Sequence, residues 1–86
     1  MNVSFTGKSY TDPKIFGITF EAIVDGVQIC CRVSTEALQD IDPPSATSDA
    51  ASQFASNRSS FEQIAEKLIH AGRVKDGQVF INSADL

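Results

Sequence analysis

The feature that most constrains this chain is the dipeptide Asp25-Gly26, which separates two stretches of alternating apolar and polar residues. A type I′ turn needs positive φ at both central positions, so an Asp-Gly pair in this setting predicts a β-hairpin. Side chains of a strand alternate between two faces, and this turn gives one wholly apolar face. That face consists of Ile18, Phe20, Ala22, Val24, Val27, Ile29, Cys31 and Val33.

Both cysteines lie next to each other in the second predicted strand, Cys31 on the core face and Cys30 on the opposite face. Neighbours in a strand point to opposite sides, so the pair is unsuited to a shared metal ion or an unstrained disulfide. His70 is the only histidine and no Cys-x-x-Cys occurs, so the spacing of a zinc site is absent. We expect no metal and no cofactor.

Two helices are predicted after the hairpin. Ser34 is placed to cap a short helix over residues 35–41, which the Asp-Pro-Pro run at 42–44 ends. Apolar residues recur at helical spacing from about Ser48 to Ala71, and Gly72 is placed to end this long helix.

The long helix has one internal conflict. Ser59 with Glu62, and Ser60 with Gln63, both form capping-box patterns, which indicate a break near residues 57–60. Phe54 and Phe61 lie seven residues apart and would share one face of a continuous helix, so continuity is the expectation.

The remaining segments complete an α+β domain. Val3–Phe5 is predicted as a short strand, Tyr10–Pro13 as a turn, and Asp76-Gly77 as a second turn before a strand over 79–82. We expect one domain, 1–86, with an antiparallel sheet of about four strands and the long helix over one face. The strand order does not follow from the sequence.

Composition limits the function. The 86 residues are 42% hydrophobic and 21% charged, which is typical of one soluble domain, and the net charge is −4. That charge argues against nucleic acid as a partner, although it leaves room for a local basic patch. No apolar run approaches the roughly 20 residues of a membrane span, and the first residues lack signal-peptide features. A cytoplasmic protein without membrane contact is the expectation.

Asn57, Arg58 and Glu62 are the first candidate binding site. Asparagine is a poor residue for a helix interior, and Arg58 would border the apolar stripe one turn after Phe54. A polar site for a carboxylate, a phosphate or a partner backbone is one interpretation. The local alternative pairs Arg58 with Glu62 and lets Asn57 cap a kink.

Four basic residues form a second candidate, a small anion or nucleic-acid patch: Lys67, His70, Arg73 and Lys75. The alternative is that these side chains complement the dipole at the end of the long helix. A third surface, Ile15 and Ile23 with Cys30, is a candidate for a homodimer or partner contact.

The pattern also resembles domain-of-unknown-function family 1488, small bacterial proteins of about this length. The resemblance rests on Val24-Asp25-Gly26, Cys31, Ser34 with Glu36-Ala37-Leu38, and Phe54, Asn57, Arg58 and Glu62. Two departures are Cys30, where the family pattern has a proline, and Tyr10, an aromatic displaced from the position before Asp12. The resemblance implies an α+β fold and a bacterial cytoplasmic setting, without an established activity. Some members are described as transcriptional regulators.

Three functional hypotheses follow. The leading one is a non-enzymatic module that binds an unknown protein partner, with a homodimer as one form of it. The second is a nucleic-acid-associated regulator acting through Arg73 and Lys75. The last is a small thiol enzyme with Cys31 or Cys30 as nucleophile and His70 as base, which the expected burial of Cys31 opposes.

Overall fold

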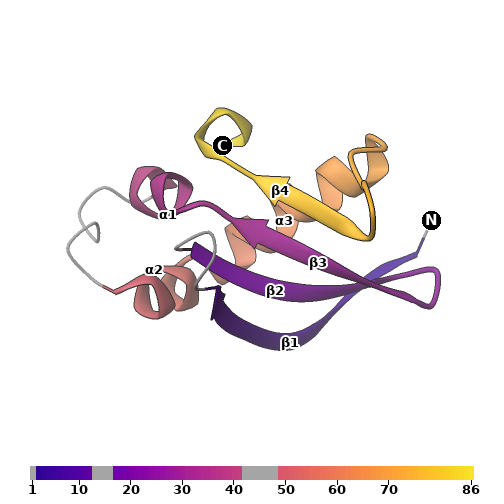
Figure 1. Ribbon diagram of the computed structural model, residues 1–86, viewed down its shortest axis with the longest axis horizontal. Coiled ribbons are helices and arrows are strands. Elements are labelled where there is room, and N and C mark those ends of the chain that lie inside the picture. The colour runs from indigo at the N-terminus through magenta and orange to yellow at the C-terminus, as the bar shows by residue number, and fades with distance from the viewer. Residues whose placement is uncertain (1, 13–16, 42–48) are drawn as a thin grey trace.

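The computed structural model describes residues 2–12, 17–41 and 49–86. Within these ranges lie the strands β1 (Val3–Asp12), β2 (Gly17–Val24), β3 (Val27–Val33) and β4 (Gln78–Ile81), in the spatial order β1-β2-β3-β4. The helices are α1 (Thr35–Ile41), α2 (Ala50–Ser56) and α3 (Arg58–His70), with a 3₁₀ turn at Ser83–Asp85. In Figure 1, α3 passes behind β3 and β4, and α2 lies at the left end of the sheet, next to β1 and β2. The expected α+β class, with a long and a short helix, is confirmed.

The hairpin has the predicted register. Ile18 pairs with Val33, Phe20 with Cys31, and Val24 with Val27. Asp25 and Gly26 have φ values of 50° and 85°, which are those of a type I′ turn. Six of the eight residues on the apolar face are buried, whereas Val24 is half-buried and Val27 is 61% exposed at the hairpin tip.

The sheet is antiparallel only in part, which corrects one expectation. β1, β2 and β3 form an antiparallel meander, but β4 runs parallel to β3, with Val33 opposite Ile81. A parallel neighbour requires a crossover connection, and the helices between β3 and β4 provide it. The alternation of apolar residues in β4 is the same for either direction, so the sequence pattern does not reveal the difference.

The ends of two elements also differ from expectation. Tyr10 and Thr11, expected in a turn, belong to β1 and pair with Thr19 and Ile18. The other end of that predicted turn, Pro13, lies outside the described residues, as does Ile15. The second Asp-Gly turn is present, with φ values of 54° and 72° at Asp76 and Gly77, and β4 starts one residue earlier than predicted.

The predicted continuous helix over 48–71 is wrong, because the chain breaks at Asn57 into α2 and α3. Asn57 has φ −123° and ψ 20°, and its side-chain Nδ2 donates to the carbonyl oxygen of Gln53 at 3.0 Å. This bond offers the backbone an alternative to the helical ladder. Phe54 and Phe61 nevertheless both reach the core, so the reason given for continuity does not require a single helix.

Helix ends follow the predicted chemistry. The N–H of Ala37 donates to Ser34 Oγ at 3.1 Å, so Ser34 caps α1. At the end of α3, Arg73 N donates to Leu68 O at 3.0 Å and Gly72 N to Ile69 O at 3.1 Å. These two bonds form a Schellman motif with Gly72 at φ 78°, and they fix where the chain leaves the helix.

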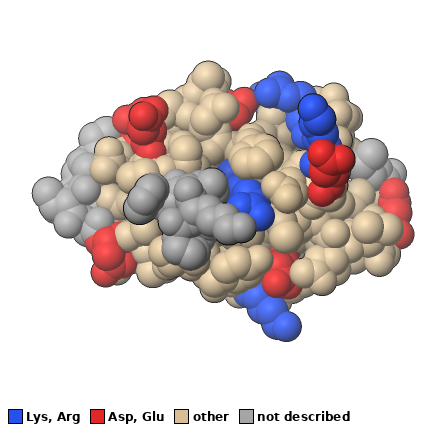
Figure 2. All heavy atoms as spheres, viewed as in Figure 1, with Lys and Arg blue, Asp and Glu red and all other residues tan. Residues whose placement is uncertain are grey.

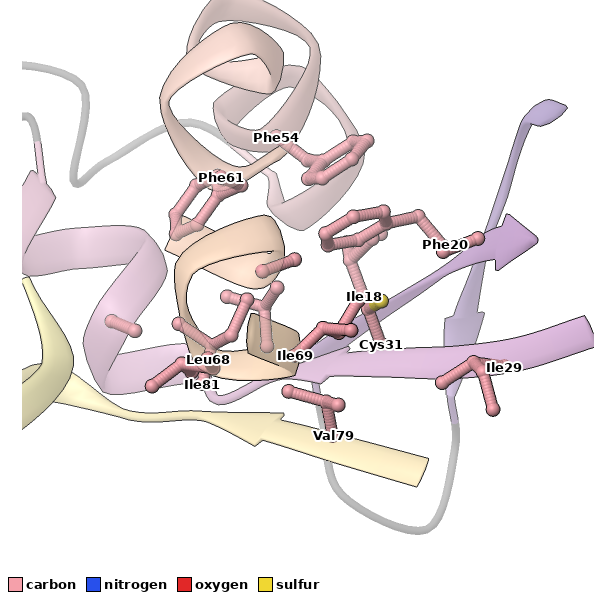
Figure 3. Packing of buried hydrophobic residues seen from close by; sticks show 14 of the residues in the cluster. Ile18, Phe20, Ile29, Cys31, Phe54, Phe61, Leu68, Ile69, Val79 and Ile81 are labelled. Atoms are coloured by element: carbon pink, nitrogen blue, oxygen red, sulfur yellow. The ribbon is translucent and has the colours of Figure 1, made fainter. Parts of the chain in front are cut away.

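The core lies between the sheet and the helices, and the rings of Phe20, Phe54 and Phe61 lie next to one another in it (Figure 3). The ring centroids of Phe20 and Phe54 are 5.0 Å apart, and those of Phe54 and Phe61 are 5.9 Å apart. Phe5 of β1 lies 6.0 Å from Phe20. Contacts among these four rings therefore connect the edge strand β1 to β2, α2 and α3. The buried apolar residues are Ile18, Phe20, Ala22, Ile29, Cys31, Val33, Ala37, Leu38, Phe54, Phe61, Ala65, Leu68, Ile69, Val79 and Ile81.

Candidate functional site

The side of the sheet turned away from α2 and α3, here called the open face, carries side chains of all four strands. The strand registers align one row across it, in which Tyr10 pairs with Thr19, Thr19 with Arg32, and Arg32 with Phe80. Next to this row, Glu21 pairs with Cys30 and Cys30 with Gln78. The open face therefore consists of Tyr10, Thr19, Glu21, Ile23, Gln28, Cys30, Arg32, Gln78 and Phe80.

Two aromatic side chains stand at the ends of the row. Tyr10 is 49% exposed and Phe80 is 55% exposed, whereas Thr19 between them is only 1% exposed. Partial burial and the neighbouring Cys30 thiol raise the pKa of the Tyr10 phenol. A tyrosine phenol has an ordinary pKa of 10.0, so it is protonated at neutral pH and can donate as well as accept a hydrogen bond. Figure 2 shows basic atoms near the middle of this side of the molecule.

A groove of about 400 Å³ runs along β4, and its lining joins the open face to the turn that precedes β4. The lining residues are Arg73, Lys75, Asp76, Gln78, Phe80 and Asn82. Basic atoms lie beside an acidic group at the upper right in Figure 2, above the start of β4.

Asn57, Arg58 and Glu62, predicted as a binding site, come together on the helical layer. Arg58 Nε lies 3.3 Å from Glu62 Oε2, and the guanidinium carbon is 5.3 Å from the centroid of the Phe54 ring. These contacts are those of the local interpretation, in which Arg58 pairs along the helix. Any role of the three residues in binding stays a prediction.

Replacing Asn57 with alanine is expected to lower the free energy of unfolding by about 1 kcal/mol, because the side-chain bond to Gln53 O is lost. Urea denaturation measures this change. Ser59→Ala, an exposed position two residues later, is the control and should stay within about 0.5 kcal/mol of wild type. An Asn57→Ala variant as stable as wild type would contradict a structural role and favour the ligand-binding interpretation.

The four residues of the predicted anion patch are divided by the structure. Arg73 and Lys75 both line the groove, whereas Lys67 and His70 belong to the last turn of α3. His70 Nε2 lies 3.7 Å from Glu66 Oε1, with both side chains about half exposed. The groove thus holds half of the predicted patch.

The Cys31 thiol has the surroundings of a core residue, which do not favour a nucleophile. Cys31 is 0% exposed, and burial raises the pKa of its thiol to about 12. A thiol with such a pKa is not a thiolate at neutral pH. Cys30 is half-buried on the open face, and both cysteines are free.

We expect alkylation of the native protein with iodoacetamide to modify Cys30 and to spare Cys31 until the chain unfolds. Mass spectrometry of the modified peptides measures the two rates separately. A Cys31 rate that matches the Cys30 rate in the folded chain would contradict its burial.

The same thiol predicts a pH effect. An unfolded thiol ionises near 9.0 while native Cys31 stays protonated to about 12. The free energy of unfolding should therefore fall as pH rises through this interval. A Cys31→Ala variant should lose this part of the pH dependence, and an unchanged slope would contradict it.

Within residues 2–12, 17–41 and 49–86, His, Cys, Asp and Glu form no group of three or more that could hold a metal ion. None of the described helices is long and apolar enough to cross a membrane. Of the predicted dimer surface, Ile23 and Cys30 are half-buried on the open face, and Ile15 lies outside the described residues.

Sequence reasoning missed Phe80 and Tyr10 as surface residues. A signal was available for Phe80, since it alternates with Val79 and Ile81 in a strand and therefore points away from the core. For Tyr10 the signal was hidden by the prediction of a turn where β1 continues.

Comparisons with known proteins agree with this architecture. A solved protein of unknown function from Shewanella loihica PV-4, assigned to the DUF1488 family, superposes with a TM-score of 0.76. It is 26% identical, and the similarity covers 94% of each chain. No curated protein matches. The sequence profile of DUF1488, described as a protein family of unknown function, matches residues 3–81. The chain therefore belongs to the DUF1488 family.

Proposed function

We propose that this protein is a non-enzymatic interaction module whose docking surface is the open face. The observation that carries the proposal is the row of Tyr10, Arg32 and Phe80, in which two large aromatic side chains remain about half exposed on an ordered sheet. Aromatic residues and arginine are enriched at protein–protein interfaces, and tyrosine and arginine are frequent energetic centres of such interfaces.

The packing of the residues around this row also supports a docking surface. Thr19 is 1% exposed and Arg32 and Cys30 are half-buried, so this part of the face is closely packed. Side chains on strands are positioned more rigidly than side chains on loops, so little ordering entropy opposes binding.

The test is affinity capture from an extract of the encoding organism, with wild type, two double variants and Arg58→Gln as bait. The face variant is Tyr10→Ser/Phe80→Ser. The matched control is Val27→Ser/Leu86→Ser, which removes two other large apolar side chains, 61% and 46% exposed. A partner protein should be retained by wild type and control, lost with the face variant, and unaffected by nuclease.

Three results would contradict the proposal. Equal retention by the face variant would move docking away from the open face. Retention lost with Arg58→Gln instead would favour the site at Asn57, Arg58 and Glu62. Recovery abolished by nuclease would favour the regulator hypothesis.

Sedimentation of the purified chain tests the homodimer form of the same idea. If a second copy covers the open face, wild type and the Val27→Ser/Leu86→Ser control should sediment as dimers and the face variant as a monomer. A monomer in all three forms would leave a different protein as the partner.

A further inference from the structure

The groove along β4 has walls that are fixed by the backbone. Arg73 is held by its N–H bond to Leu68 O at 3.0 Å. Lys75 and Gln78 exchange two backbone bonds, Lys75 N to Gln78 O at 2.9 Å and Gln78 N to Lys75 O at 3.0 Å. The backbone positions that carry the Arg73 and Lys75 side chains are therefore held by hydrogen bonds, although both residues lie beyond the end of α3.

The lining of the groove carries more positive than negative charge. Arg73 and Lys75 form no ion pair with any residue that the structure describes, in a chain whose net charge is −4. Asp76 is the one acid in the lining, and the turn with Gly77 gives it a backbone reason to be there. Two cations against one acid make the groove locally positive, so it complements a partner that carries carboxylates.

The rest of the lining is apolar and amide-bearing. Phe80 is 55% exposed and presents an aromatic face, with Gln78 and Asn82 on the same side of β4. A partner that satisfies this lining needs an apolar side chain next to its acids. Arginine and carboxylate groups can in addition form paired hydrogen bonds.

Addition of a strand to the edge of β4 is opposed by the backbone bonds. The N–H and C=O of Gln78 are already bonded to Lys75, and the N–H of Asn82 donates to Asp85 Oδ2 at 3.0 Å. Only the backbone of Phe80 lies between these closed positions. The partner is therefore recognised by the side chains of the groove and not by a continued β-ladder.

We propose that this groove binds an acidic segment of a partner protein, with carboxylates at Arg73 and Lys75 and an apolar side chain on Phe80. This inference rests on the proposed function and names the chemistry of its partner. A protein segment fits better than nucleic acid, because the lining offers only two cations next to the apolar Phe80 ring, whereas a continuous phosphate backbone needs an extended basic surface.

The experiment uses fluorescent peptides and the intact chain. One peptide alternates glutamate with leucine, a second has lysine in place of glutamate, and a third has serine in place of leucine. Fluorescence anisotropy measures affinity, and amide NMR shifts locate the bound peptide. The glutamate–leucine peptide should bind most tightly, and its shifts should fall on residues 73–82.

Two charge variants provide the matched comparison. Arg73→Gln/Lys75→Gln and Lys8→Gln/Lys67→Gln each remove two positive charges, but only the first pair lies in the groove. The groove variant should bind the peptide about fivefold more weakly, as two exposed ion pairs would predict, and the other should bind as wild type. Asp76→Asn should tighten binding, and asparagine tolerates the positive φ there.

Several outcomes would overturn the inference: absence of peptide binding, equal loss in both charge variants, shifts outside residues 73–82, or tighter binding of oligothymidylate. If peptides fail while the Tyr10→Ser/Phe80→Ser variant still loses its captured partner, the docking face is right and the ligand chemistry is wrong. If peptides bind as expected and capture is unaffected by the face variant, the proposed function fails and the groove stands alone.

Discussion

Replacement of Phe20 by alanine is expected to lower the free energy of unfolding by about 3–5 kcal/mol. Phe20 is 1% exposed, and its ring touches Phe5 of β1 and Phe54 of α2, at centroid distances of 6.0 and 5.0 Å. Removing the ring leaves a cavity between the sheet and the helices, and it also removes two aromatic contacts. A domain of this size has a total stability of roughly 4–13 kcal/mol, so this loss is a large share of the total.

Urea denaturation followed by circular dichroism measures this loss, with Phe20→Leu as the control. Leucine keeps most of the apolar volume, so the control should lose less than half as much stability. If the free energy of unfolding of Phe20→Ala stayed within about 1 kcal/mol of wild type, the ring contacts of Phe20 would contribute little to the stability of the core.

The second large effect is expected at Gly17, where alanine should cost about 3 kcal/mol, the upper end of the usual penalty for overpacking. A Cβ atom at this position would overlap the backbone carbonyl oxygen of Val33 far inside van der Waals contact. The obstacle is backbone and not a flexible side chain, so β2 and β3 would have to separate at the end of the hairpin.

Gly77→Ala provides the comparison, because it tests backbone conformation without a clash. Gly77 has φ 72°, and a Cβ atom there would meet nothing within 4 Å. Its loss should be about 1 kcal/mol, the usual cost of a left-handed residue with a side chain. Equal losses at the two positions would show that β2 and β3 are not closely apposed at Gly17.

The parts of the fold that followed from the sequence are those in which two local signals agree. At the hairpin, the Asp25-Gly26 turn and the facial sorting of Phe20 and Cys31 predict the same register. At the end of α3, the apolar period stops where Gly72 can adopt positive φ. Each of these features depends on residues that are close in the sequence, so the local sequence pattern is sufficient to predict it.

The parts that did not follow depend on distant contacts. The direction of β4 depends on the path of the crossover, and Val79 and Ile81 would be buried in either direction. At Asn57 two local signals conflicted, and the observed break still brings Phe54 and Phe61 into one core. The predicted site residues were chosen by residue type. The groove instead depends on Arg73 and Phe80, which lie on either side of the Asp76-Gly77 turn and line one surface.

The parallel pairing of β4 has a consequence for the order in which the molecule assembles. β1, β2 and β3 follow one another in the sequence and pair with their sequence neighbours, whereas β4 pairs with β3 across a connection that contains α1, α2 and α3. Loop-closure entropy makes such a contact late to form, and it should also be the first of the sheet pairings to open. Since Gln78 and Phe80 line the groove, an occupant would hold the last-formed strand in place, and hydrogen exchange there should slow when the groove is filled.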